Sequence, residues 1–346
     1  MTAVVPLIPE DEKWEKFLEQ NDHLIFHTPL YKKFVEAAFD LKVLYYAAVK
    51  GETIRALLPV FPIQHKILSS KLISTAFLEY GGPCGDGKSL ENIVSYLEQN
   101  FGKKYTHLEI RAGLKAQEPV LDRIMKRDVP YKRFVLELGS ENDVWRNIQR
   151  EKRKAVRKAE RLGIVVREVP YRNIDALYDI YCRNMKDFGS PPFGRSYFES
   201  FFNNLVSQEM GKIFGSYHQG RLVSFLSGLC YRDRIHIVIS VARPEYLKYR
   251  INDAMHWAFI RFACHRGFRW FDFGRVRPES GQYDYKKKWG CTLHDLPHHY
   301  LLWKSKRIPC VDPENPKYRM MTSVWRRLPL SWTTRIGPWI RKGLGI

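Results

Sequence analysis

The residues most able to do chemistry lie in one block in the second half of the sequence. Residues 267–275 read GFRWFDFGR, and residues 281–290 read GQYDYKKKWG. An apolar run that ends in Asp272, Gly274 and Arg275 is typical of a buried strand. Such a strand would place an acid and a guanidinium at the carboxyl edge of a sheet, where ligands of α/β proteins collect. The plainer alternative is that Asp272 caps the next turn and pairs with Arg275.

A second group of candidate ligands consists of Cys291, His294, His298 and His299, which could be drawn as a zinc site. The first two fall in a turn, and the adjacent His298 and His299 would point to opposite faces of a strand. We therefore predict no metal site. The cysteines include no C-x-x-C pair, which indicates free thiols in a reducing compartment. They are Cys84, Cys182, Cys230, Cys264, Cys291 and Cys310.

A strongly basic segment precedes the block. Residues 144–162 predict a single helix with Ser140 or Asp143 as its cap and one narrow apolar stripe. The other faces carry two glutamates and eight basic residues, namely Arg146, Arg150, Lys152, Arg153, Lys154, Arg157, Lys158 and Arg161. This density fits either a solvated face or a phosphate-binding face, in which Arg153 and Arg157 would be ligands.

The elements that would position these residues occur twice along the chain. Each half predicts a helix, an antiparallel hairpin, a second helix and a further strand. The ranges are 31–39, 43–62, 90–101 and 107–111, and then 197–205, 212–231, 253–266 and 268–273. Two copies of one α/β unit follow. We expect domains at 1–138 and 139–305 and a basic tail at 306–346.

The tail has a distinctive composition. It carries nine Lys or Arg against two acids, and its tryptophans recur every seven residues at Trp325, Trp332 and Trp339. Pro329 and Pro338 are expected to interrupt any single long helix. Short amphipathic turns with Trp and Arg suit a membrane interface. The alternative is that the tail wraps back and buries its tryptophans on the domain.

The composition limits the classes of partner and location. A chain of 346 residues is long enough for two cores, and a net charge of +20 indicates a polyanionic partner such as nucleic acid, an anionic membrane or a phosphate-bearing substrate. The first residues lack a signal-peptide pattern, and no apolar run approaches the roughly 20 residues that span a bilayer. We expect a cytoplasmic protein, either free or peripheral on the inner face of the cytoplasmic membrane.

These motifs together resemble the Fem family of cell-envelope peptidyltransferases. Residues 267–290 are similar to the family's C-terminal motif, and residues 153–168 are similar to its interdomain pattern. Trp14 and the Glu-Tyr-Gly-Gly-Pro run at 79–83 resemble the first half of the family. Residues 315–338 resemble the tail of the Fem-like subgroup associated with the exosortase/PEP-CTERM system for exopolysaccharide and surface-protein export. The match covers nearly the whole chain.

The resemblance implies an α/β (α+β) fold of two tandem GNAT-like acyltransferase domains, each with a mixed, mostly antiparallel sheet flanked by helices. It implies transfer of an acyl or aminoacyl group to an amine, from aminoacyl-tRNA or from an acyl thioester such as acyl-CoA, with no tightly bound cofactor. The expected acceptor is a phosphate-bearing or lipid-linked precursor of the envelope or an exopolysaccharide. A non-catalytic GNAT-like protein that docks on anionic membrane or RNA is the alternative.

The resemblance also assigns roles to residues. Lys286 would stabilise the oxyanion that forms when the amine attacks the acyl carbonyl. Asp272 would orient Lys286 or accept a proton, and Arg275 would hold a phosphate. The other expected substrate-binding residues are Asn252, Tyr283, Tyr285 and Trp289, with Arg153 and Arg157 of the basic segment.

One departure from the wider GNAT pattern bears on the donor. Enzymes that use acetyl-CoA carry [QR]-x-x-G-x-[GA] at the start of a helix, where backbone amides bind the pyrophosphate. Residues 249–254 here read YRINDA and contain no glycine. The departure favours aminoacyl-tRNA or a differently held thioester over ordinary acetyl-CoA.

Overall fold

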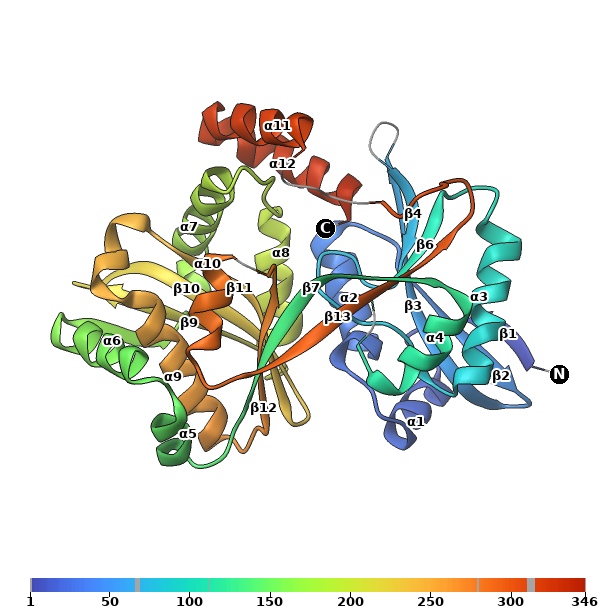
Figure 1. Ribbon diagram of the computed structural model, residues 1–346, viewed down its shortest axis with the longest axis horizontal. Coiled ribbons are helices and arrows are strands. Elements are labelled where there is room, and N and C mark those ends of the chain that lie inside the picture. Colours follow the sequence, from blue (N-terminus) through green and yellow to red (C-terminus); the bar gives the residue numbers. More distant parts are fainter. Residues whose placement is uncertain (1, 66–68, 112, 279, 310–314, 346) are drawn as a thin grey trace. The chain divides into compact units, whose positions relative to one another are not determined.

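The computed structural model describes residues 2–65, 69–111, 113–278, 280–309 and 315–345, so Cys310 lies outside the described residues. The chain forms two compact units. The first unit comprises Met1–Pro130, Leu296–Pro313 and Pro338–Ile346. The second unit comprises Tyr131–Asp295 and Glu314–Gly337. Each unit is built around its own sheet (Figure 1).

The sheet of the first unit is mostly antiparallel. Its order is β1 (Thr2–Pro6), β2 (Leu44–Lys50), β3 (Thr53–His65), β4 (Ser69–Ile73), β6 (His107–Arg111) and the end of β13 (Thr292–Leu302), and β5 (Cys84–Gly85) pairs with β3. Only β4 and β6 pair in parallel among these strands as described. The helices are α1 (Glu12–Gln20), α2 (Pro29–Phe39), α3 (Gly87–Phe101) and α4 (Glu118–Ile124).

The sheet of the second unit has the same pattern. Its order is β7 (Lys126–Glu137), β12 (Trp270–Val276), β11 (Arg234–Ala242), β10 (Arg221–Tyr231), β9 (Gly211–His218) and β8 (Ile164–Glu168). The pair β11 and β12 is parallel. The helices are α5 (Glu141–Asn147), α6 (Arg150–Arg161), α7 (Ile174–Asp187), α8 (Arg195–Ser200), a π-helix (Phe201–Val206), α9 (Ile251–His265), α10 (Gly281–Lys287) and α11 (Pro316–Arg327). The first part of α12 (Leu330–Leu344), up to Gly337, also belongs to this unit.

The two sheets exchange their last strands. In each, four antiparallel strands are followed by one parallel strand and a final antiparallel strand. The final strand of the first unit is β13, through His298–Leu302, and that of the second unit is β7, through residues 132–137. The compact units therefore depart from the expected boundaries 1–138, 139–305 and 306–346, because β7, β13 and the tail contribute residues across them. The predicted repeat and the mixed, mostly antiparallel α/β fold are confirmed.

The basic segment at 144–162 is two helices, so the prediction of one helix is wrong. α5 ends at Asn147, and Ile148 and Gln149 are extended, with ψ values of 139° and 142°. Two observations account for the break. Ile148 is buried in the core of the second unit, and the amide of Gln149 donates to the carbonyl of Lys288 at 3.2 Å.

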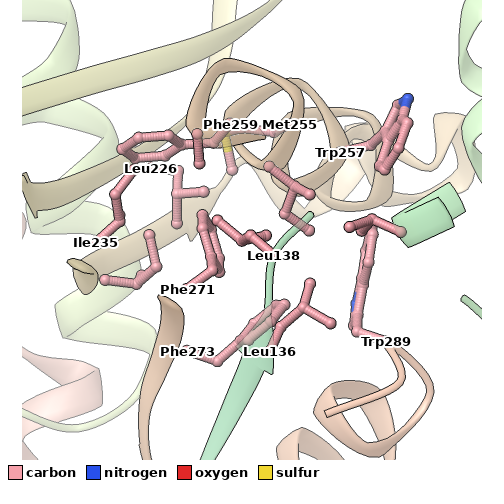
Figure 2. Close-up of a cluster of buried hydrophobic side chains, with 14 of the residues drawn as sticks. Leu136, Leu138, Leu226, Ile235, Met255, Trp257, Phe259, Phe271, Phe273 and Trp289 are labelled. Atoms are coloured by element: carbon pink, nitrogen blue, oxygen red, sulfur yellow. The ribbon is translucent and has the colours of Figure 1, made fainter. Parts of the chain in front are cut away.

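The main core of the second unit packs α9 against the sheet (Figure 2). Phe271 and Phe273 of β12 point into this core beside Leu136 of β7 and Phe259 of α9. Because side chains alternate along a strand, Asp272 faces the other side of the sheet. The alternation of side chains along β12 therefore determines the face of the sheet on which Asp272 lies.

The expectation that the tail buries its tryptophans holds for one of the three. Of its tryptophans, Trp325 is buried, whereas Trp332 and Trp339 are 62% and 61% exposed. The chain does break near Pro329, between α11 and α12, but Pro338 lies inside α12 without ending it. Among the described residues, no helix combines the length and the apolar character that crossing a membrane requires.

Candidate functional site

The candidate site lies where β11 and β12 stop pairing. Three residue pairs join these parallel strands, and the last is His236 with Asp272. Both strands continue beyond it, to Ala242 and Val276. The register of β10 against β11 shifts at Ser227, and the register of β12 against β7 shifts after Asp272. Bulges of this kind bend strands apart, so the carboxyl ends of two parallel strands diverge here.

The side chain of Asp272 is held in place by several contacts. Its carboxylate is completely buried, accepts the amide N–H of Gly274 at 2.9 Å and binds Nη1 of Arg133 at 3.0 Å. Nδ1 of His236 lies 3.7 Å from the same carboxylate. The guanidinium compensates a charge that would otherwise be costly to bury. Gly274 has φ +71°, a backbone conformation that favours glycine.

Lys286 reaches the same turn from α10. Ser280 caps this helix by accepting the amide of Tyr283. The partly buried ammonium of Lys286 donates to the carbonyls of Gly274 at 3.1 Å and Arg275 at 2.8 Å. Lys286 therefore lies at the end of β12, at the residue that Asp272 also binds. The structure brings these two predicted residues together.

The thiol of Cys291 lies within range of the charges of both Asp272 and Lys286. Burial raises the pKa of the Cys291 thiol, the negative charge of Asp272 raises it further, and the positive charge of Lys286 lowers it. The thiol is therefore neutral near pH 7 and is no candidate nucleophile.

The predicted substrate-binding residues of this block have different surroundings. The guanidinium of Arg275 lies over the ring of Tyr131, 5.0 Å from its centroid. Tyr283 is partly buried and meets Phe134 edge to face, with ring centroids 5.0 Å apart. Trp289 is completely buried in the core, where it packs between Phe273 and Tyr285. In this conformation Trp289 supports the site from within, and the substrate-binding roles stay predictions.

A buried ion pair joins α6 to the start of α9. Nζ of Lys152 lies 2.7 Å from Oδ1 of Asp253 and 3.4 Å from the ring centroid of Tyr285. Burial lowers the pKa of Lys152, and the carboxylate works against this. The hydroxyl of Tyr285 is 3.3 Å from Nδ1 of His256, and burial together with Asp253 raises the pKa of Tyr285 well above 10.

Sequence reasoning missed this pair because it counted Lys152 with the solvated basic residues. A signal was present. Lys152 lies four residues after Ile148 and three before Ala155, on the apolar stripe of the segment, and Asp253 interrupts an otherwise apolar helix. Two opposite charges, each on the apolar face of a helix, predict a buried ion pair.

The other three predicted ligands lie near this pair. Arg153 donates to the carbonyls of Trp145 and Arg146 at the end of α5, and Arg157 stacks on Trp145. Asn252 is in the first turn of α9, and its carbonyl binds Nδ1 of His256. Its side-chain Oδ1 is buried without a hydrogen-bond partner among the described residues.

The first unit fills the equivalent position with its own side chains. Its last parallel pair joins Ile73 to Glu109, and Arg111 follows Glu109 as Gly274 follows Asp272. Arg111 binds Glu109 at 2.8 Å and also donates to the carbonyls of Thr75 and Leu78. A guanidinium thus bridges the diverging strands of the first unit, whereas the second unit has a glycine there.

The drawn zinc cluster does not form among the described residues, which contain no group of three metal-ligating side chains. The two histidines of β13 instead pair with acids of the first unit. His298 lies 3.4 Å from Glu109, and His299 lies 2.7 Å from Asp122.

Comparisons with known proteins identify the fold. Residues 146–287 match the family model described as acetyltransferase (GNAT) domain. A comparison with curated protein sequences found no match. The point at which β11 and β12 stop pairing lies within the matched residues.

Solved structures extend the likeness to both units. The crystal structure of FemX is similar to this chain with a TM-score of 0.67 and 11% sequence identity. The alignment covers 92% of this chain and 100% of the FemX chain. L-PGS from Bacillus licheniformis has a TM-score of 0.60 at 14% identity and covers 92% and 98%. A tandem GNAT protein from the clavulanic acid biosynthesis pathway has a TM-score of 0.56 at 10% identity and covers 89% and 100%. The predicted tandem GNAT-like fold is confirmed.

Proposed function

We propose that this chain transfers an acyl or aminoacyl group from an aminoacyl-tRNA or an acyl thioester to an amine on a precursor of the cell envelope or an exopolysaccharide. The proposal rests on the ammonium of Lys286, which two carbonyls hold at the end of β12 beside the buried Asp272. The motifs of the tail extend the proposal to the exosortase-associated Fem-like subgroup.

The proposed step is nucleophilic acyl transfer. The acceptor nitrogen attacks the acyl carbon, a C–N bond forms and the carbonyl oxygen becomes an oxyanion. Collapse of this intermediate breaks the C–O bond to tRNA or the C–S bond to the thiol, and the proton of the amine passes to the leaving group. A fixed positive charge at Lys286 would stabilise the oxyanion more than the neutral carbonyl, which is the requirement for catalysis.

The surroundings of Asp272 favour one of its two expected roles. Its carboxylate is buried and already engaged with Arg133 and Gly274. These contacts support a positioning role, in which Asp272 fixes the turn that holds Lys286. The role of proton acceptor has less support, since both carboxylate oxygens already accept hydrogen bonds, Oδ1 from Gly274 and Oδ2 from Arg133.

The first unit is proposed to take no direct part in the chemistry. Arg111 occupies the position between its diverging strands, where its guanidinium donates to the carbonyls of Thr75 and Leu78 in the segment after β4. A donor would have to displace a buried, hydrogen-bonded guanidinium, at a cost that Gly274 does not impose in the second unit.

The start of α9 supports a donor other than ordinary acetyl-CoA. Arg250 has φ +61° and caps the helix without a side-chain hydrogen bond, and the first turn contains the ion-paired Asp253. A carboxylate in the first turn competes with a pyrophosphate for the helix N-terminus. The exposed Arg157 and its basic neighbours on α6 fit a phosphate-bearing substrate, tRNA among them.

The experiment supplies purified full-length protein with charged tRNA or acyl-CoA and the envelope fraction of cells that lack the gene, and mass spectrometry identifies the modified amine. Lys286→Met should reduce transfer by at least about a hundredfold, the scale of losing one oxyanion donor. Lys287→Met, at the exposed neighbouring lysine, is the control and should retain transfer. Unchanged transfer by Lys286→Met would refute the mechanism.

The alternative is a non-catalytic protein that binds anionic membrane or RNA. The exposed basic residues of α6 are the observation that favours it. Binding of this kind should weaken steeply with salt and should be the same in Lys286→Met. If neither donor class yields a modified amine while salt-sensitive binding persists, this alternative replaces the transferase.

A further inference from the structure

The two helices at the end of the chain expose large apolar side chains. In the second unit, α11 exposes Met320, Met321 and Val324, and α12 exposes Trp332 and Ile336. We call these five residues the tail surface. The spacing places Met320 and Val324 on one face of α11, and Trp332 and Ile336 on one face of α12. Clusters of this kind on a protein surface mark an interaction site.

α12 is amphipathic in the reverse of the usual sense. Its buried positions hold small residues, with Thr333 only 1% exposed and Gly337 packed so that an added Cβ would lie 2.3 Å from Pro192. Its exposed positions hold Trp332, at 62%, and Ile336, next to Ser331 and Arg335. An ordinary surface helix buries its large apolar residues and exposes its small or polar ones. The outward face of α12 therefore combines large apolar side chains with an arginine.

The helices are anchored, so this exposure is not a matter of loose packing. Trp325 of α11 is buried, and Nζ of Lys186 in α7 donates to the carbonyl of Arg326 at 2.6 Å. Thr322 lies so close to Gly189 that an added Cβ would come within 2.8 Å of it. Figure 1 shows α11 beside α7. The exposed apolar side chains of α11 therefore lie on a helix that is fixed to the second unit.

The charge of the tail selects the chemistry of the partner. From residue 316 to residue 344 the sequence contains no Asp or Glu and seven basic residues, namely Lys317, Arg319, Arg326, Arg327, Arg335, Arg341 and Lys342. A second copy of this chain would bring like charges together, which is unfavourable. RNA would use the arginines but not the methionines and isoleucine. Tryptophan, aliphatic side chains and arginine together suit the interface of an anionic bilayer.

We propose that α11 and the first half of α12 dock the protein on the surface of a bilayer that contains anionic phospholipid. Trp332, Ile336 and Met320 enter the boundary between headgroups and acyl chains, and the arginines contact lipid phosphates. The contact is peripheral, since the described helices include none suited to crossing a membrane. This inference does not depend on acyl transfer.

The test measures co-sedimentation of the full-length protein with phosphatidylcholine vesicles that contain or lack phosphatidylglycerol. Wild type should bind the anionic vesicles and release them as salt rises. The double variant Trp332→Ser/Ile336→Ser should bind at least about tenfold more weakly, because each lost apolar side chain removes a large transfer free energy. Val165→Ser, at an exposed apolar residue of β8, should bind like wild type.

A second pair of variants tests the charge. Arg319→Gln/Arg335→Gln should lower binding to anionic vesicles, and Arg172→Gln/Arg221→Gln, at exposed arginines elsewhere in the second unit, should not. Equal binding to both lipid compositions would overturn the proposal. Unchanged vesicle binding by the Trp332/Ile336 variant would also overturn it. A variant that binds vesicles normally but no longer dimerises, or no longer binds tRNA, would show that the surface contacts a different partner. Lys286→Met should bind vesicles normally, so failure here and failure of the proposed function are distinguishable.

Discussion

Asp272 and Lys286 hold the same residue from two directions. The carboxylate of Asp272 accepts the amide of Gly274 at 2.9 Å, and the ammonium of Lys286 donates to the carbonyl of Gly274 at 3.1 Å. The turn after the last parallel pair is thus fixed at both ends of one residue. A change at Gly274 should disturb both predicted catalytic residues at once.

Replacing Gly274 by alanine tests this relationship. With φ +71°, alanine there should lower the free energy of unfolding by about 1–2 kcal/mol. Transfer should fall as well, because the carbonyl that Lys286 binds would move. Gly267→Ala is the control, with φ +72° and open space around the added Cβ. It should lose similar stability in urea but keep transfer; equal loss of transfer in both variants would contradict a specific role.

Removing Arg133 should expose the cost of burying Asp272. Arg133→Met leaves a completely buried carboxylate without its guanidinium, and we expect a loss of about 3–5 kcal/mol in the free energy of unfolding. Lys132→Met, at the neighbouring residue, breaks a more exposed pair with Asp295 and should cost about 1 kcal/mol or less. Similar losses in both, measured by chemical denaturation, would show that Asp272 does not depend on Arg133.

A double-mutant cycle should measure the buried pair between α6 and α9. Lys152→Met and Asp253→Leu should each destabilise the protein, and the double variant should recover part of the loss, with a coupling of about 1–3 kcal/mol. The cycle on the exposed pair Lys288 and Glu151 should give about 0–1 kcal/mol. Equal coupling in the two cycles would argue against a special contribution from burial.

Buried histidines should make stability depend on pH. Burial lowers the pKa of His256 from 6.5 to about 4. Burial also lowers the pKa values of His27 and His107 to about 4. The unfolded chain therefore binds protons at a higher pH than the folded chain. The contribution of His256 is complete above pH 6.5 and is lost as the pH falls towards 4, by roughly 3 kcal/mol.

Urea denaturation between pH 7.5 and about 4.5 checks this expectation. His256→Gln should show a shallower fall in the free energy of unfolding with decreasing pH than wild type. His218→Gln, at a partly exposed histidine at the end of β9, serves as a composition control. Parallel pH profiles for wild type and His256→Gln would contradict the assignment.

The local elements of this protein could be predicted because their signals lie within a few residues. The hairpin expected at 212–231 is β9 and β10, and the apolar run that ends in Asp272 is β12. The alternation that buries Phe271 and Phe273 also gave Asp272 its direction. Motif resemblance then led to Lys286, which the structure places at the end of that strand.

The remaining features depend on partners that are distant in the sequence. Lys152 looked solvated because its partner, Asp253, lies 101 residues away. The break at Ile148 depends on a carbonyl of Lys288, and the exchange of β7 and β13 depends on pairings that no local pattern specifies. Helical periodicity reports which face is apolar, and it does not report which buried neighbour a charge will meet.

The exchanged final strands set an order for biosynthesis. The edge of β6 stays open until residues 298–302 of β13 have been made, long after the other strands of the first sheet have emerged from the ribosome. The sheet of the first unit therefore stays incomplete while the second half of the chain is translated. A protein with this connectivity should gain its native protease resistance in one late event rather than one domain at a time.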